Sequence, residues 1–258
     1  MQENQATAAR ENIMGTMDIN PLLVKLSVPM MVSMLVQALY NVVDSVFVSH
    51  VSESALTAVS LAFSLQNVMI AVGVGTGVGV NALLSKSLGE KNQERANKTA
   101  QNGIFLAFCS FAVFFLIGLT CMRPYFYAQT SDAEIAEQGI RYLRVCSVFS
   151  LGLFLQTMSE KLLAATGRTH LSMISQLIGA VINIILDPIF IFCFKWGMMG
   201  AAVATVIGQV FTAVLALWYL LHMKIIKPAS GDYTLRWSIC GRMLTLGITS
   251  FLSQISLV

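Results

Sequence analysis

The chain has 258 residues, of which 56% are hydrophobic and only 11% are Asp, Glu, Lys or Arg, and its formal net charge is +3. Because about a quarter of the residues of a soluble domain are charged, this composition excludes an ordinary water-soluble domain. The small net charge, without a basic tract that contains aromatic residues, argues against a nucleic-acid partner.

Long uncharged segments are the main feature along the chain. No charged residue occurs between Glu53 and Lys86 or between Lys98 and Arg123, whereas a helix needs about 20 residues to cross a bilayer. These segments also lack the alternation of polar and apolar residues that is typical of barrel strands. The sequence therefore predicts an all-α fold, a polytopic bundle of membrane helices.

Polar breaks divide the chain into four parts. Residues 1–20 form a polar tail without the apolar region of a signal peptide, residues 21–223 a six-helix transmembrane lobe, residues 224–242 a basic linker, and residues 243–258 the truncated start of a second lobe. The seventh helix, which begins near Met243, holds about 15 of the roughly 20 residues that a span needs, so we expect a longer protein. The six complete spans are predicted at Leu22–Val48, Ala55–Leu84, Thr99–Met122, Arg141–Lys161, Leu171–Phe194 and Gly200–His222.

The basic residues predict the orientation of the spans. If the N terminus is inside, the tail and the inner loops hold 12 Lys and Arg residues, against four on the other side, Arg123, Arg141, Arg144 and Lys195. The positive-inside rule therefore favours a cytoplasmic N terminus. We expect a multi-pass protein of the cell membrane (an inner or plasma membrane), with lipid as its surroundings.

Two carboxylates, Asp44 and Asp187, lie inside predicted spans, where an acidic residue costs about 2.5–3.5 kcal/mol on insertion scales. At about 1.5 Å of rise per residue, both lie about 9–12 Å below the outer ends of their helices, at the level of Asn183 and Thr205. We therefore expect these four residues to meet. Further polar residues share their helix faces at helical spacing and predict a wet cavity: Gln37, Tyr40, Asn41, Gln176 and Gln209.

Prolines next to these groups add carbonyl oxygens. Pro188 directly follows Asp187, and Pro29 lies in the first span; each removes an amide that would bond a carbonyl one turn earlier. Freed carbonyls beside carboxylates suit a hard cation such as sodium, or a proton relay.

Two other patterns are interpreted as structural. Gly73, Gly75, Gly77 and Gly79 lie inside an uncharged span rather than after a strand, so they indicate close helix packing and not a nucleotide-binding loop. The adjacent Glu160–Lys161, near the inner end of the fourth span, is interpreted as a local pair.

Several segments resemble the multidrug and toxic compound extrusion (MATE) family. They are Leu26-Ser-Val-Pro-Met, Tyr40-Asn-Val-Val-Asp-Ser-Val-Phe-Val, Ala55-Leu-Thr-Ala-Val-Ser-Leu-Ala, the segment from Gly77 to Gly89, and Leu186-Asp-Pro-Ile-Phe. The resemblance implies a twelve-helix exporter with two six-helix lobes, of which this chain is the N-terminal lobe plus the start of the seventh helix. It also implies a cation site at Asp44, Asn183, Asp187 and Thr205. One departure is Thr249 in the seventh helix, where the first helix has Pro29.

The implied function is a cation-coupled antiporter that exports drug-like amphipathic compounds by alternating access. It is not an enzyme and needs no cofactor beyond its coupling ion, sodium or a proton; in the sodium case the same four residues are the metal ligands. Its partners are the missing C-terminal lobe and a small-molecule substrate. The alternatives are a lipid-linked oligosaccharide flippase of related architecture, which would need a basic cavity, and a non-transporting membrane fragment. An intramembrane aspartyl protease is disfavoured because its Tyr-Asp and Gly-x-Gly-Asp motifs are absent.

Overall fold

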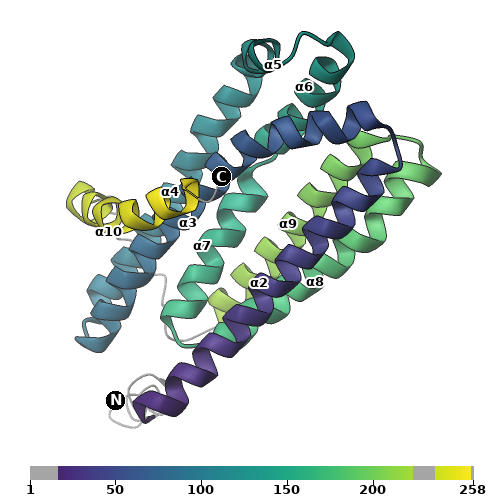
Figure 1. The fold of residues 1–258 in the computed structure, drawn as a ribbon. Coiled ribbons are helices and arrows are strands. Elements are labelled where there is room, and N and C mark those ends of the chain that lie inside the picture. Colours follow the sequence, from purple (N-terminus) through teal and green to yellow (C-terminus); the bar gives the residue numbers. More distant parts are fainter. Residues whose placement is uncertain (1–16, 223–235, 257–258) are drawn as a thin grey trace.

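The computed structural model describes residues 17–222 and 236–256, and all its regular elements in these ranges are helical (Figure 1). This confirms the predicted all-α fold. Residues 1–16 of the predicted tail and residues 224–235 of the predicted linker lie outside the described residues. In chain order the helices are α2 (Ile19–Ser49), α3 (Glu53–Gly89), α4 (Gln93–Thr120), α5 (Met122–Gln129), α6 (Ala133–Val148), α7 (Leu151–Ala165), α8 (Thr169–Pro188), the π-helix η2 (Ile189–Cys193), α9 (Met198–His222) and α10 (Trp237–Ile255).

Among the described residues, five helical segments are long and apolar enough to cross a membrane: α2, α3, α4, α8 continued by η2, and α9. They correspond to the first, second, third, fifth and sixth predicted spans. The α-helical pattern of α8 ends at Pro188, where a π-helical turn begins, because proline has no amide to continue the ladder. Pro29, in contrast, lies within α2 without ending it.

The fourth predicted span, residues 141–161, is wrong as a single helix, because the chain breaks at Phe149 and Ser150 between α6 and α7. The amide of Ser150 bonds to the carbonyl of Ser147 (3.3 Å), and that of Gly152 to the carbonyl of Phe149 (3.4 Å). Both bonds span three residues instead of four, so the helix tightens and turns here. The hydroxyl of Ser150 also donates to the Ser147 carbonyl (2.7 Å), which stabilises the break.

The helices that carry the predicted polar faces pack side by side. α2 packs on α8, α8 on α9, and α7 on α9 and on α3 (Figure 1). α2 also exposes large apolar side chains such as Leu23, Met34 and Leu39, as expected of a helix in contact with lipid. Of the polar residues predicted on the inner face of α2, Tyr40 and Asp44 are half-buried, whereas Gln37 and Asn41 are exposed.

The α3 glycines pack against other helices, as predicted. A Cβ on Gly79 would overlap the carbonyl of Met243 in α10, and one on Gly75 would lie 2.9 Å from Cβ of Phe251. α10 crosses α3 here (Figure 1) and begins at Trp237, ahead of the start predicted near Met243. Small residues at these positions let the two backbones approach closely.

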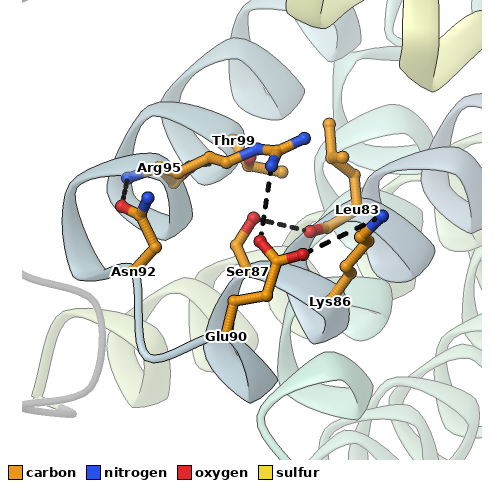
Figure 2. A network of polar contacts seen from close by, with 7 residues as sticks. All are labelled: Leu83, Lys86, Ser87, Glu90, Asn92, Arg95 and Thr99. Atoms are coloured by element: carbon orange, nitrogen blue, oxygen red, sulfur yellow. Dashed lines mark hydrogen bonds and ion pairs between the residues drawn. The ribbon is translucent and has the colours of Figure 1, made fainter.

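A polar network closes the turn between α3 and α4 (Figure 2). The carboxylate of Glu90 pairs with Lys86 (3.9 Å) and with Arg95 (3.4 Å). Lys91 follows with a left-handed φ of 54°, and the side-chain oxygen of Asn92 then accepts from the backbone amide of Arg95 (3.0 Å). Asn92 thereby satisfies an amide that the first turn of α4 cannot bond internally.

Loss of this cap should lower stability. For Asn92→Ala in the full-length protein we expect a loss of about 1 kcal/mol and a lower unfolding temperature, because the alanine cannot accept the Arg95 amide. Tryptophan fluorescence during heating in detergent measures the change. Asn92→Asp keeps the acceptor and serves as the control; equal unfolding temperatures for Asn92→Ala and Asn92→Asp would show that the cap does not contribute.

Candidate ion and substrate site

Three of the four residues predicted to form the ion site are in contact. Asn183 and Asp187 lie one turn apart on α8, and their side chains are 3% and 0% exposed. The Asn183 amide is assigned the orientation in which both its nitrogen and its oxygen form hydrogen bonds. The nitrogen then donates to Oδ2 of Asp187 (3.2 Å), and the oxygen accepts from the backbone amide of Thr205 (3.1 Å). α8 and α9 therefore meet at this amide.

Two glycines allow this meeting. A Cβ on Gly179 would overlap the hydroxyl of Thr212 and lie 2.9 Å from the carbonyl of Gly208. A Cβ on Gly208 would in turn lie 2.9 Å from the carbonyl of Gly179. The backbones of α8 and α9 are thus as close as only glycine permits. Because Asn183 lies one turn beyond Gly179, its short side chain reaches the backbone of α9.

Asp44 approaches the same place from α2. It is half-buried, and its Oδ1 is fully buried without a hydrogen-bond partner. Its charge repels that of Asp187. Together with Thr205 and other residues, Asp44 lines the Asp44 cavity, whose empty volume is about 830 Å³ including the open space at its mouth.

The two acids lack a basic partner. In residues 17–222 and 236–256 three ion pairs form, and all involve Glu90 or Glu94 at the α3–α4 turn. A buried charge without a partner is costly, and two like charges close together raise the cost. The arrangement is therefore suited to a cation or a proton that neutralises the pair.

The five residues predicted to line a substrate cavity all lie in cavity walls. Gln37, Tyr40 and Gln209 line both the Asp44 cavity and a second one, the Gln176 cavity, with an empty volume of about 410 Å³. Asn41 lines only the former and Gln176 only the latter. Because Gln37, Tyr40 and Gln209 belong to the walls of both, the two cavities adjoin.

Among the residues of the Asp44 cavity that sequence reasoning missed is a hydrogen-bonded group of three polar side chains. Gln66 of α3 donates to the hydroxyl of Tyr142 (3.2 Å) and to the sulfur of Cys146 (3.5 Å), both on α6, and all three line the cavity. Tyr142 and Cys146 were missed because the predicted fourth span had no assigned inner face. Their spacing of four residues, which places them on one helix face, is the signal that could have found them.

Comparisons with known proteins agree with this architecture. The family model MatE matches residues 29–189, more than half of the chain. The multidrug export protein MepA of Staphylococcus aureus (strain bovine RF122 / ET3-1) is 24% identical over 238 residues, which are 89% of this chain and 51% of that protein. The rabbit (Oryctolagus cuniculus) multidrug and toxin extrusion protein 1 is 26% identical over 215 residues, covering 83% of this chain and 38% of that protein.

A solved structure is similar over the same region. It is described as the outward-facing conformation of a multidrug resistance MATE family transporter, and it superposes with a TM-score of 0.86 at 29% identity. The similarity covers 91% of this chain and 52% of that one. The chain thus spans about half the length of the MepA protein and of the solved transporter.

Proposed function

Because the chain belongs to the MATE family of multidrug efflux transporters, we propose that the full-length protein is an antiporter. It exchanges sodium or protons, moving inward, for drug-like amphipathic compounds, moving outward. The printed names of the bacterial and the rabbit relatives, a multidrug export protein and a multidrug and toxin extrusion protein, support this substrate class. Since this chain spans about half of these relatives or less, the proposal concerns the protein together with its C-terminal lobe.

One observation carries the proposal: among the described residues, neither the buried Asp187 nor the half-buried Asp44 has a basic partner. Asp44 has a buried oxygen without a donor, and the charge of Asp44 repels that of the fully buried Asp187. Sodium would find carboxylate and amide oxygens here, the ligands that hard cations prefer. A proton would remove one of the two charges. In either case the ion is held by Asp44, Asn183, Asp187 and Thr205.

Coupling follows from the shared wall of the two cavities. Tyr40 and Gln209 line both, so a helix movement that contracts the Asp44 cavity around an ion also reshapes the space for the substrate. An ion and a substrate that prefer different conformations then alternate, which is the requirement for exchange.

The walls of the Asp44 and Gln176 cavities disfavour the flippase alternative, and the basic cavity lined by Arg95, Lys98, Arg236 and Arg242 shares no residue with them. A lipid-linked pyrophosphate needs Lys or Arg at its binding site. Among the described residues, neither the Asp44 cavity nor the Gln176 cavity is lined by either residue.

The proposal is tested with the full-length protein in liposomes. We expect a fluorescent lipophilic cation to move against its gradient when sodium or protons are allowed to flow in the opposite direction, and not without an ion gradient. Separate sodium and pH gradients identify the coupling ion. Movement that is equal with and without both gradients would contradict antiport.

A further inference from the structure

The basic cavity lies where α3 ends and α4 and α10 begin. Four basic side chains line it: Arg95 and Lys98 in the first turns of α4, and Arg236 and Arg242 at the start of α10. Its accessible volume is about 390 Å³, within the range of about 300–1,000 Å³ that is typical of small-molecule sites. The proposed exchange of an ion for a drug uses none of these side chains.

The charges around the basic cavity are unbalanced. Arg95 pairs with Glu90 (3.4 Å; Figure 2), and Lys98 pairs with Glu94. The two arginines at the start of α10 form no ion pair within the parts of the chain that the structure describes. Positive charge therefore exceeds negative charge here, and a cavity of one sign concentrates ligands of the other.

The two basic walls are held together by Asn102, one turn beyond Lys98 on α4. Its side-chain oxygen accepts from the backbone amide of Arg236 (3.2 Å) and from the thiol of Cys240 (3.4 Å). Lys98 itself is only 7% exposed, so it forms part of a packed wall rather than a mobile surface. The structure thus positions the basic side chains of α4 and α10 around one space before any ligand binds.

The surroundings of the cavity favour a lipid over a soluble anion. The ends of membrane-spanning helices lie at the level of the lipid headgroups, where tryptophan is enriched, and Trp237, the first residue of α10, is 75% exposed. Deeper along the helices, the side chains next to the cavity are apolar and exposed. Phe105 lies two turns beyond Lys98 on α4, and Leu246 lies one turn beyond Arg242 on α10, each on the same helix face as the basic residue. An acyl chain can therefore follow these side chains out of the cavity.

We propose that the basic cavity binds the phosphate group of an anionic phospholipid. The guanidinium groups of Arg236 and Arg242 donate to the phosphate oxygens, for which their paired donors are well suited. The glycerol part lies against Leu83 and Ile239, which also line the cavity. Basic pockets between membrane helices are typical sites for anionic headgroups. The lipid is held in place and is not the exported compound.

The linker of the chain itself is a poor occupant of the basic cavity. Its residues 224–235 contain two lysines and one aspartate, so their net charge has the same sign as that of the cavity. Like charges repel, and the linker therefore cannot supply the missing negative charge.

A bound phosphate joins two parts of the protein. Two of the basic side chains belong to α4, in the six-helix lobe, and two to α10, which resembles the start of the second lobe. A ligand that contacts both helices in the folded state, and not in the unfolded chain, raises the unfolding temperature. We therefore expect the anionic lipid to stabilise the full-length protein against heating.

Lipid binding to the full-length protein in a non-ionic detergent tests the site. The probes are dioleoylphosphatidylglycerol and dioleoylphosphatidylcholine, which share their acyl chains and one phosphate but differ in net charge, and native mass spectrometry measures the affinity for the first lipid bound. We expect the parent to prefer the anionic lipid by about tenfold or more. The double variant Arg236→Gln/Arg242→Gln should reduce this preference to less than about threefold.

Two further variants separate the site from the total charge. Lys25→Gln/Arg123→Gln removes the same charge at exposed positions outside the basic cavity and should keep the preference. Arg236→Lys/Arg242→Lys keeps the positive charge and should retain part of it. The rise in unfolding temperature with the anionic lipid should follow the same order, because it reports the same binding.

Three results would overturn the inference. The first is an equal affinity of the parent for the two lipids, and the second is an unchanged preference in Arg236→Gln/Arg242→Gln. The third is displacement of the anionic lipid by glycerol 3-phosphate at the same concentration, which would assign the cavity to a soluble phosphate. Since no ion gradient or drug is present, these outcomes do not depend on whether the protein is an antiporter.

Discussion

Asp187→Asn in the full-length protein is expected to reduce ion-driven export by about tenfold to a hundredfold, because a charged hydrogen-bonding group contributes about 1.5–3 kcal/mol. The carboxylate of Asp187 is fully buried and accepts from Asn183. An amide of the same shape can still bond with Asn183, but it cannot neutralise a cation or carry a proton. The same change at Asp44 should have the same effect, since its unpartnered oxygen completes the group.

Although export by these variants should fall, their thermal stability should not. Asp187 is buried, has no basic partner in the part of the chain that the structure describes, and is repelled by Asp44, so removing its charge should leave the unfolding temperature unchanged or raise it. Export from liposomes and heating in detergent measure the two effects. Asp132→Asn is the matched control, because Asp132 caps α6 at an exposed position and asparagine caps equally well. Full ion-driven export by both Asp187→Asn and Asp44→Asn would refute the ion site.

The sequence predicted the neighbourhood of Asn183, Asp187 and Thr205 because two simple rules determine it. Helical spacing placed Asn183 and Asp187 on one face of α8, and the rise per residue placed Thr205 at the same depth on α9. Each rule depends only on positions along a regular helix. The contacts of the Asn183 amide with Asp187 and with Thr205 agree with both rules.

The remaining features depend on local hydrogen bonds or on contacts between helices, which the pattern of apolar residues does not reveal. The break between α6 and α7 arises from local hydrogen bonds at Ser150, in a segment apolar enough to resemble one span. The prediction of a local pair of Glu160 and Lys161 is wrong as a direct contact, because none of the ion pairs of the described residues includes Glu160. Glu160 and Lys161 are adjacent in sequence, but successive residues on a helix point in different directions. Helical spacing alone could have paired Gln156 with Glu160, four residues apart on α7, but the contact of Lys161 with α3 at Gly77 becomes apparent only once α7 is packed.

Gly179 was also missed, because a single glycine in an apolar helix gives no signal of what it contacts. We expect Gly179→Ala to destabilise the protein by about 1–3 kcal/mol, although alanine favours a helix more than glycine does. The added methyl group would overlap the hydroxyl of Thr212 and lie 2.9 Å from the carbonyl of Gly208. The hydroxyl can rotate away, but the carbonyl belongs to the backbone, so α8 and α9 must separate. Asn183 would then lose its contact with the amide of Thr205.

Gly89→Ala separates this steric effect from helix propensity. Nothing lies within 4 Å of a Cβ at Gly89, near the end of α3, so there the same substitution should raise stability by up to about 1 kcal/mol. Unfolding temperatures in detergent should therefore shift in opposite directions for the two variants. Export by Gly179→Ala should fall as well, because the ion site needs the close approach of α8 and α9. If Gly179→Ala were as stable and as active as Gly89→Ala, the separation of these helices would not determine the geometry of the site.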